Sequence, residues 1–552
     1  MGETITVSVV GEPTPISAPS GTTLLELSKS CAHLSSRPII LAKVNQKLQD
    51  LCVPLSVDCT VEFLDISDPN GYRAYQRSVA FLMIYAAKLV LGRKTRIVIE
   101  HSINKNYYCE TPELGMEVSE SLLDQIESEM LKAAEKDYPI EKFSLPLDDA
   151  IKRAAEFELF DKIDILKYRR TSNVNFYKLD WFYDYFYGQM LPSTGYLKSF
   201  KLIKKSKGFM LQFPSAANDY EIAEMSPNNK ISEVFEESNE WAHILKVDTV
   251  GQLNSLICNG GVGDIIRVNE ALHEKKIAYL ADKIHQLNKT IVLIAGPSSS
   301  GKTTFAQRLC IQLRVNGLKP IVISLDNYFW DREITPRDAS GNYDFESLDA
   351  IDLNQINADL DALLKGKAVS MPSFNFTEGK REYKGKPLSL GNDDVLVIEG
   401  IHGLNEKVTE LIPKQRKFKI FASALTQVNI DDHNRIPTTD TRLIRRLVRD
   451  HKYRGADART TIAMWPSVLR GENKYIFPFQ EEADAFFNSA LVYEMCILKQ
   501  FAEPLLFNID KSYREYTEAM RLIKFLDSFL GVSSELVADN SILREFIGGS
   551  CF

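Results

Sequence analysis

The sequence predicts an α/β protein of several domains, whose C-terminal half is built on a parallel sheet flanked by helices. Three observations support this prediction. The chain has 552 residues, which is far more than a single hydrophobic core organises. From residue 289, apolar strand-like runs alternate with amphipathic helical runs, as in "TIVLIAG", "KTTFAQRLCIQLRVNG" and "KPIVISLD". Residues 3–66 instead contain short alternating runs such as "TITVSVV", which are typical of a small β-rich unit.

Turn-forming residues and changes of pattern divide the chain into segments. The stretch "DISDPNGY" at residues 65–72 combines Asp, Pro, Asn and Gly, and it marks the end of the β-rich unit. A helical pattern over residues 72–92 then opens a second unit, which mixes strands and helices. We therefore expect units at residues 1–67, 68–225, 226–288, 289–515 and 516–552, of which the third is a helical connector and the last a helical tail.

The composition is that of a globular protein, with 44% hydrophobic and 25% charged residues. The formal net charge of −8 argues against a chain dedicated to binding nucleic acid. The eight cysteines have no C-x-x-C spacing and the eight histidines are dispersed, which indicates reduced thiols and no metal cluster. Because no apolar run reaches membrane-spanning length and no secretory signal is visible, we expect a cytoplasmic protein without a membrane partner.

The sequence contains a phosphate-binding loop. "GPSSSGKT" at residues 296–303 fits the pattern G-x-x-x-x-G-K-[ST], and it lies between an apolar strand and a helical run, which argues against a merely structural Gly/Ser turn. Lys302 can reach the β- and γ-phosphates, and the Thr303 hydroxyl can bind Mg²⁺. We expect ATP and Mg²⁺ as cofactors, with the nucleotide bound by Gly296, Pro297, Ser298, Ser299, Ser300, Gly301, Lys302, Thr303 and Thr304.

Two carboxylates stand at the ends of predicted strands. Glu399 ends the run in "DDVLVIEG", and Asp326 follows "IVISL". Because the carboxyl ends of parallel strands border the ligand crevice, Glu399 is a candidate Mg²⁺ ligand, directly or through water. Asp326 is a candidate general base for an acceptor hydroxyl. The alternatives are a solvent-facing acid for Glu399 and a helix N-cap for Asp326.

A predicted helix near the C-terminal end of this unit is rich in arginine. "TRLIRRLVRDHKYR" at residues 441–454 places several guanidinium groups on one helical face, which suits bidentate binding of phosphate. These are Arg442, Arg445, Arg446 and Arg449. The alternative is a solvated basic face paired with Asp440 and Asp450.

Five blocks in order, "GPSSSGKTT", "SLDNYF", "YDFESLDAID", "MPSFNF" followed by an arginine, and "DTRLIRRLVRDHKYRG", resemble the uridine kinase / phosphoribulokinase family of P-loop kinases. The resemblance covers about residues 290–510. It implies transfer of the γ-phosphate of ATP to the 5′-hydroxyl of a nucleoside. The implied roles are general base for Asp326, ribose binding for Asp344, substrate contact for Phe374, Arg381 and Arg454, and charge stabilisation for Lys302, Arg446 and Arg449.

The chain departs from this family at three positions that read the substrate. Phe374 and Gly379 stand where the family has a Tyr and a His, and Ala456 replaces the second Arg of an R-G-R motif. Because missing hydrogen-bond partners weaken selectivity, the base preference stays open. The alternatives are a kinase for another small alcohol or sugar phosphate, or a regulator that binds RNA or nucleotides.

Residues 3–66 resemble the TGS domain of threonyl-tRNA synthetases, and residues 68–225 resemble the editing domain that follows it there. "GYRAYQRSVAFLMIYAAKLV" and "DYFYGQMLPSTGYLKSFKL" support the resemblance. The editing site uses H-x-x-x-H, a Cys and a further His, where this chain has Phe81, Tyr85, Phe186 and Met190. We therefore expect no deacylation, and we expect Phe81 and Tyr85 to pack in the core. RNA contact, a small ligand, or a homo-oligomer contact remain open roles for this half.

Overall fold

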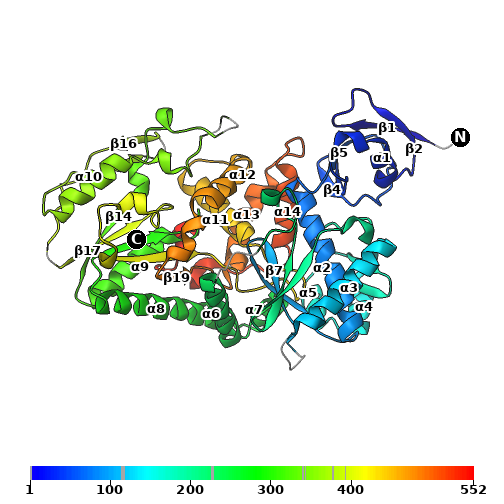
Figure 1. The fold of residues 1–552 in the computed structure, drawn as a ribbon, viewed down its shortest axis with the longest axis horizontal. Helices are drawn as coiled ribbons and strands as arrows, with labels where there is room; N and C mark the ends of the chain where they lie inside the picture. Colours follow the sequence, from blue (N-terminus) through cyan, green and yellow to red (C-terminus); the bar gives the residue numbers. More distant parts are fainter. Residues whose placement is uncertain are drawn as a thin grey trace.

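The computed structural model describes residues 3–112, 118–224, 229–338, 341, 343–375, 378–391 and 393–552. Figure 1 shows the C-terminal α/β unit on one side, and the β-rich and α+β units on the other. Helix α14 (Tyr516–Leu526) contacts all three of these units, since its side chains bond to Gln46, Arg73 and Asp440. The units therefore pack directly against one another.

The N-terminal unit is a five-stranded mixed sheet in the order β2-β1-β5-β3-β4, with α1 packed against it. Its elements are β1 (Thr4–Val9), β2 (Ile16–Pro19), α1 (Leu24–Ser30), β3 (Leu41–Val44), β4 (Lys47–Gln49) and β5 (Cys59–Leu64). Ile5, Val7 and Val9 of β1 are buried and the residues between them are exposed, as the alternating sequence predicts.

The second unit surrounds helix α2 (Pro69–Leu91), which follows the predicted boundary. The unit contains the sheets β10-β9-β8 and β11-β12-β7-β6. Its other elements are β6 (Val98–Ile103), β7 (Asn106–Glu110), α3 (Glu120–Lys136), β8 (Ile140–Pro146), α4 (Leu147–Glu156), α5 (Phe160–Leu166), β9 (Asn173–Leu179), β10 (Phe182–Tyr185), β11 (Lys201–Lys205) and β12 (Gly208–Gln212).

The aromatic side chains of α2 lie in the core of this unit. Phe81 is fully buried, and its ring centroid lies 5.6 Å from that of Phe182 and 5.4 Å from that of Phe186. The Tyr85 hydroxyl donates a hydrogen bond of 3.0 Å to Asp180. The prediction that Phe81 and Tyr85 pack in the core is confirmed.

Three helices connect this unit to the C-terminal half: α6 (Asn229–Leu245), α7 (Val250–Cys258) and α8 (Val262–Gln286). Helix α8 packs against α9 (Lys302–Val315), the helix that follows the phosphate-binding loop. Buried Arg308 of α9 pairs with Glu270 and Glu274 of α8, so the connector is bonded to the loop helix.

The C-terminal half contains a five-stranded sheet in the order β14-β17-β13-β18-β19, and all its neighbouring strands are parallel. Ile291 and Leu293 of β13 pack into one core cluster, while Val292 and Ile294 pack into another on the opposite face. Because successive side chains of a strand point to opposite faces, both faces of the sheet are covered. The predicted α/β fold with a parallel sheet is confirmed.

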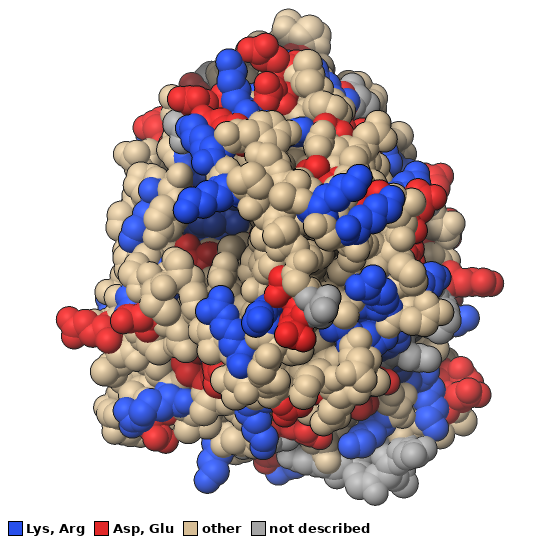
Figure 2. Space-filling model, turned by 90° about the vertical axis from the view of Figure 1, so that its left-hand side faces the viewer, with Lys and Arg blue, Asp and Glu red and all other residues tan. Residues whose placement is uncertain are grey.

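The elements of this half are β13 (Ile291–Ala295), β14 (Lys319–Ser324), α10 (Leu353–Leu364), β15 (Ser373–Asn375), β16 (Lys380–Glu382), β17 (Asp394–Glu399), β18 (Lys417–Ser423), α11 (Thr438–Tyr453), α12 (Ala458–Tyr475), β19 (Ala485–Asn488) and α13 (Glu494–Phe507). Basic and acidic side chains are interspersed over the face that Figure 2 shows, so no surface of one sign covers it.

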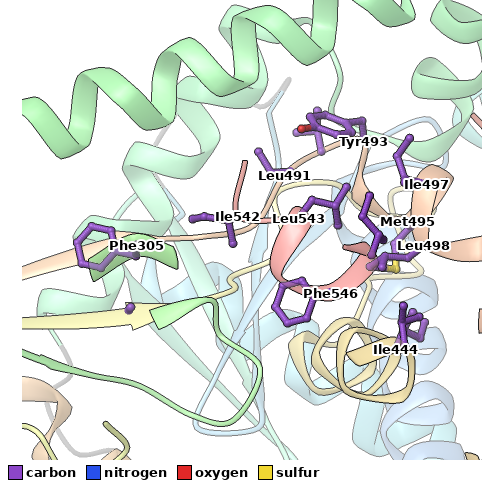
Figure 3. Packing of buried hydrophobic residues seen from close by; sticks show 14 of the residues in the cluster. Phe305, Ile444, Leu491, Tyr493, Met495, Ile497, Leu498, Ile542, Leu543 and Phe546 are labelled. Atoms are coloured by element: carbon purple, nitrogen blue, oxygen red, sulfur yellow. The ribbon is translucent and has the colours of Figure 1, made fainter. Parts of the chain in front are cut away.

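The last residues of the chain pack into the core of the C-terminal half. Helix α15 (Arg544–Ile547) and the residues before it bring Ile542, Leu543 and Phe546 against Phe305 of α9 and Ile444 of α11 (Figure 3). The segment after residue 516 is therefore integrated into the structure around the phosphate-binding loop. Among the described residues, no helix has the length and apolar character needed to cross a membrane.

Candidate active site

The loop between β13 and α9 has the backbone that its glycines predict. Ser299 and Gly301 both have left-handed backbone conformations, with φ of 60° and 77°. A Cβ atom on Gly296 would lie 1.9 Å from the carbonyl oxygen of Ala422, so only glycine fits beside β18 there. Gly301 is the N-cap of α9, whose first turn supplies free N–H groups. A loop whose N–H groups point inward, followed by the start of a helix, is a backbone arrangement that binds anions.

Lys302 lies in the first turn of α9 and is largely buried. Its Nζ donates a hydrogen bond of 3.1 Å to the Pro297 carbonyl at the start of the loop. Burial lowers the pKa of the Lys302 ammonium, and the carboxylates of Glu399 and Asp326 partly offset this effect. The lysine therefore lies within electrostatic reach of both predicted strand-end acids.

Glu399 and Asp326 lie together because their strands are neighbours. Glu399 of β17 stands opposite Ser324 of β14, and the Ser324 hydroxyl donates a hydrogen bond of 2.7 Å to Glu399 Oε1. Asp326 follows two residues later in a 3₁₀ turn (Leu325–Tyr328). The N-cap of this turn is Ser324, so Asp326 is not the N-cap that the alternative required. Burial raises the pKa of Glu399 to about 7, and repulsion by Asp326 adds to the effect.

The acids at the carboxyl edge of the sheet fit a divalent cation. Oxygen ligands suit Mg²⁺, which usually keeps several waters and binds phosphate as well. Thr303 is exposed in the first turn of α9, so its hydroxyl is available to a ligand of the loop. No cluster of three or more His, Cys, Asp or Glu suited to a metal occurs in the described residues. Thr303 and Glu399 would therefore supply only part of the coordination, and phosphate and water the rest.

Two further carboxylates bond to the loop and to the helix start. Glu472 of α12 is fully buried, and its Oε1 accepts a hydrogen bond of 2.9 Å from the Ser298 N–H. Glu545 of α15 accepts hydrogen bonds from the N–H and the hydroxyl of Thr304, at 3.3 and 3.0 Å. These carboxylates take donors that the sequence analysis assigned to phosphate.

A third carboxylate, Glu346, lies in the loop that follows the predicted ribose-binding Asp344. Burial raises the pKa of Glu346 to about 7, and the neighbouring Glu472 adds to the effect. Its Oε2 is buried without a hydrogen-bond partner among the described residues. Glu346 therefore adds a further buried carboxyl group to the surroundings of the loop, and Arg446 and Lys302 partly offset the rise of its pKa.

The arginines of α11 are buried against the phosphate-binding loop, so the alternative of a solvated basic face is wrong: Arg442 Nη1 and Arg445 Nη1 donate to the Ser298 and Ser299 carbonyls at 3.1 and 3.4 Å. Arg442 is buried and its Nη2 bonds to Glu472 at 2.7 Å, while Arg445 is fully buried and pairs with Glu494. These two side chains join α11 to α12 and α13. Three of the four predicted arginines thus reach the loop, while carboxylates of neighbouring helices also hold Arg442 and Arg445, so phosphate binding by this face stays a prediction.

Arg446 and Arg449 are placed differently. Arg446 Nη1 donates a hydrogen bond of 2.9 Å to the Ser298 hydroxyl, so this guanidinium touches the loop. Arg446, Arg449 and Arg454 gather around Asp450, and they lower its pKa although burial acts in the opposite direction. Burial, with repulsion by Arg449, lowers the pKa of Arg454 to about 10.

The predicted acceptor-binding residues lie around the segment that carries Asp326. Phe374 and Arg381 face each other across the β15–β16 hairpin. The Phe374 N–H donates to Asn327 at 3.1 Å, and Arg381 donates to the Tyr328 carbonyl at 2.8 Å and to Asp352 at 3.0 Å.

These contacts attach the hairpin directly to the Asp326 turn. Arg381 thus bonds to other groups of the protein and holds the hairpin beside the Asp326 turn. Asp344 accepts a hydrogen bond of 3.5 Å from the Tyr475 hydroxyl. Gly379 has a φ of 70°, which disfavours the family's His there. Phe376 of the same motif lies outside the described residues.

The structure brings together the loop, Asp326, Glu399 and Arg446, which the sequence identified. Sequence reasoning missed Glu472, Glu545 and Glu346 as neighbours of the loop. Glu346 stands inside the quoted "YDFESLDAID" block, which was a usable signal. Glu472 and Glu545 lie 174 and 241 residues from their bonding partners, in segments without a motif.

Known proteins are similar to two different parts of the chain. The model of the Phosphoribulokinase / Uridine kinase family matches residues 291–494. A uridine kinase of Deinococcus deserti is 29% identical over 195 residues, which are 35% of this chain and 84% of that protein. A solved structure of D-glycerate 3-kinase from Cryptococcus neoformans is 14% identical, covers 46% of this chain and 87% of its own, and has a TM-score of 0.21.

The N-terminal part is similar to threonine–tRNA ligases. The ligase of Carboxydothermus hydrogenoformans is 33% identical over 187 residues, which are 34% of this chain. This chain covers 29% of the length of that ligase. The similarity thus involves less than a third of the ligase. Residues 291–494 of this chain thus form a domain of the phosphoribulokinase / uridine kinase family, and the part before them is similar to threonine–tRNA ligases.

Proposed function

We propose that the protein is an ATP-dependent kinase that phosphorylates the primary hydroxyl of a nucleoside-like acceptor. The observation that supports this proposal most directly is the position of Asp326. Its turn follows β14, beside Glu399 of β17 and within electrostatic reach of Lys302. A base, a phosphate-binding lysine and a cation ligand are thereby grouped at one edge of the sheet.

The proposed reaction assigns one task to each group. The loop N–H groups and Lys302 would hold the β- and γ-phosphates. Thr303 and Glu399 would hold Mg²⁺, which would neutralise phosphate charge. Asp326 accepts the proton of the acceptor hydroxyl. The hydroxyl oxygen then bonds to the γ-phosphorus while the bond between this phosphorus and ADP breaks. Arg446, which touches Ser298, and Arg449 beside it stabilise the charge on the transferred group.

The acceptor would lie between the Asp326 turn and the β15–β16 hairpin. Phe374 offers an apolar wall, packed edge-to-face on Phe329 with ring centroids 6.0 Å apart. Since Phe374 and Gly379 provide no side-chain hydrogen bond to a base, we propose weak discrimination among nucleobases. Asp344 and Arg454 remain our candidates for binding the ribose side of the acceptor.

The N-terminal half does not supply an editing reaction in this proposal, because Phe81, Phe186 and Met190 are buried apolar side chains. RNA contact through this half, a homo-oligomer and a cytoplasmic location are proposals that rest on the similarity to ligases and on the composition.

The test is ATP consumption by the full chain with a panel of nucleosides, sugar phosphates and D-glycerate as acceptors. We expect turnover with one or more nucleosides, and loss of that turnover in Asp326→Asn. Turnover restricted to a sugar phosphate or another alcohol would show that the acceptor belongs to that class and not to the nucleosides. No turnover with any acceptor would contradict the kinase proposal.

A further inference from the structure

The principal cavity among the described residues lies between the N-terminal half and the kinase domain. Its volume is about 1130 Å³. Its walls include α2, the strand-end residues around Phe186, and α14, and it extends to Pro297 and Arg442 on the kinase side. Asp326, Glu399 and Lys302 do not line it, so the cavity reaches the phosphate-binding loop only at Pro297 and does not include the proposed catalytic groups.

The cavity wall is strongly basic although the protein is acidic. Among its described lining residues, ten are Lys or Arg and two are Asp or Glu, whereas the whole chain has a net charge of −8. Part of this positive charge is compensated within the protein. Arg73 and Arg521 share Glu518, and Arg521 also pairs with Asp440.

Three other basic side chains of the wall form a cluster, which we call the α2–α14 basic cluster: Arg77, Arg169 and Lys524. No described carboxylate forms an ion pair with any of them. Arg77 donates a hydrogen bond to the Gln189 carbonyl, and the Nε of Arg169 is buried without a partner in the described structure. Desolvation by the surrounding protein lowers the pKa of Lys524 to about 8, repulsion by Arg169, Lys142 and Arg77 adds to this effect, and attraction by Asp50 opposes it.

Mutual repulsion in such a cluster is relieved by a bound anion. Guanidinium and ammonium groups that converge from separate elements suit the several oxygens of a phosphate group. Aromatic side chains lie beside the cluster: Arg77 is 5.8 Å from the centroid of the Tyr187 ring, and Tyr72, Tyr107 and Tyr220 also line the cavity. Aromatic rings next to cations offer a stacking surface for a nucleobase.

We propose that this cavity is a second nucleotide site, with phosphates on Arg77, Arg169 and Lys524 and the base against the tyrosines of the wall. The volume exceeds the space that a drug-sized ligand needs, roughly 300–1,000 Å³. The net negative charge of the chain favours a small anion over a long polyanion. A single-stranded RNA presents the same groups, and it is therefore an arm of the test.

The test variants follow from the contacts of the wall. Arg73 and Arg521 join α14 to α2 and α11, so replacing them would disturb the packing of the units. Arg169 and Lys524 make no such pairs, and solvent reaches Lys524 inside the cavity. We therefore choose Arg169→Gln/Lys524→Gln. The matched control is Lys511→Gln/Arg514→Gln, which removes the same two charges from exposed positions outside the cavity.

The measurement is calorimetric titration of the full chain with UTP. We expect two sites in the native protein and one in Lys302→Ala, because that change removes the loop lysine only. Adding Arg169→Gln/Lys524→Gln to Lys302→Ala should weaken the remaining site about tenfold to hundredfold, and the control pair should leave it within about twofold. Unchanged thermal unfolding would show that the double variant is folded. If it is not folded, the single variant Lys524→Gln is used in its place.

Three results would overturn the proposal. The first is an absence of UTP binding in Lys302→Ala. The second is equal weakening by the cavity pair and by the control pair, because the effect would then reflect overall charge. The third is binding of a single-stranded RNA, but not of UTP, that depends on Arg169 and Lys524. Each result is independent of kinase turnover, so it is distinguishable from a failure of the proposed reaction.

Discussion

At the scale of single residues, Glu346 shows how burial makes ionisation of a carboxyl group unfavourable. Its carboxyl lies near Glu472 and Asp326, and Lys302 and Arg446 offset only part of the repulsion. The raised pKa means that the folded protein holds this proton where the unfolded chain releases it. The fold is therefore less stable with Glu346 ionised than the same fold with a neutral side chain in its place.

We expect Glu346→Gln to stabilise the protein at pH 8 and not at pH 4. The pKa of Glu346 rises from 4.5 to about 7 on folding, so native stability falls as the pH rises through this window. The variant should lack this fall, which amounts to about 1–3 kcal/mol in the free energy of unfolding. Urea unfolding at pH 4, 6 and 8 measures it, and parallel pH profiles for the two proteins would refute the assignment.

Sequence reasoning located the residues that belong to a local motif. Gly296, Lys302 and Thr303 are adjacent in the chain, and Asp326 and Glu399 end apolar strands, so their meeting follows from the parallel sheet. The contacts of Glu472 and Glu545 with the loop were not predictable, because these residues belong to no motif associated with a phosphate-binding loop. Their contacts with Ser298 and Thr304 arise only from packing of distant segments.

At the scale of elements, the C-terminal helix α15 places a carboxylate at the start of α9. The Glu545 carboxylate accepts both donors of Thr304, and the side chain of Ile542 lies 2.5 Å from where a Cβ on Gly301 would be. A carboxylate at a helix N-terminus stabilises the helix in the same way as a phosphate does. In the proposed mode of ATP binding, the tail therefore occupies donors that the nucleotide would need.

We expect Glu545→Gln to tighten ATP binding about threefold to tenfold, while it costs about 0.5–1 kcal/mol of stability. The reason is that the change removes a negative charge beside the nucleotide phosphates and weakens the helix-end interaction. Titration with a non-hydrolysable ATP analogue measures the affinity. Glu535→Gln, at an exposed position of the same tail, is the control. Weaker binding in Glu545→Gln would show that this carboxylate assists the nucleotide instead.

The element scale also shows where pattern analysis succeeds. The strand β13 and helix α9 were predictable because an apolar run, a Gly-rich turn and an amphipathic run follow one another. Helix α11 was predicted as a helix, but its arginines serve two purposes. Arg442 and Arg445 pair with acids of α12 and α13, and a sequence cannot show which side of a helix meets such acids.

At the scale of the whole molecule, a buried ion cluster joins the α+β unit to the kinase domain. Lys162 of α5 is fully buried and bonds to Asp431, which follows β18 in the kinase domain, and lies 3.6 Å from Asp184 of β10. Asp184 also bonds to His433 at 2.6 Å. These partners are 249 and 269 residues apart in the chain, so no sequence pattern predicted the contact.

We expect Lys162→Ala to destabilise the protein by about 3–5 kcal/mol, because two carboxylates would remain buried without their cation. Lys167→Ala, at an exposed position directly after the same helix, removes one surface pair with Asp164 and should cost about 1 kcal/mol or less. Thermal unfolding of both variants measures the difference. Equal, small effects would show that the units do not depend on this cluster.

The most direct measurement of the central claim is kcat for ATP-dependent phosphorylation by the native protein and by Asp326→Asn, with the ATP affinity of each. A general base at Asp326 predicts that the variant binds ATP as tightly as the native protein and loses about 10²–10⁴-fold in kcat. A kcat within about threefold of the native value, or a loss confined to ATP binding, would contradict the role of Asp326 and with it the proposed reaction.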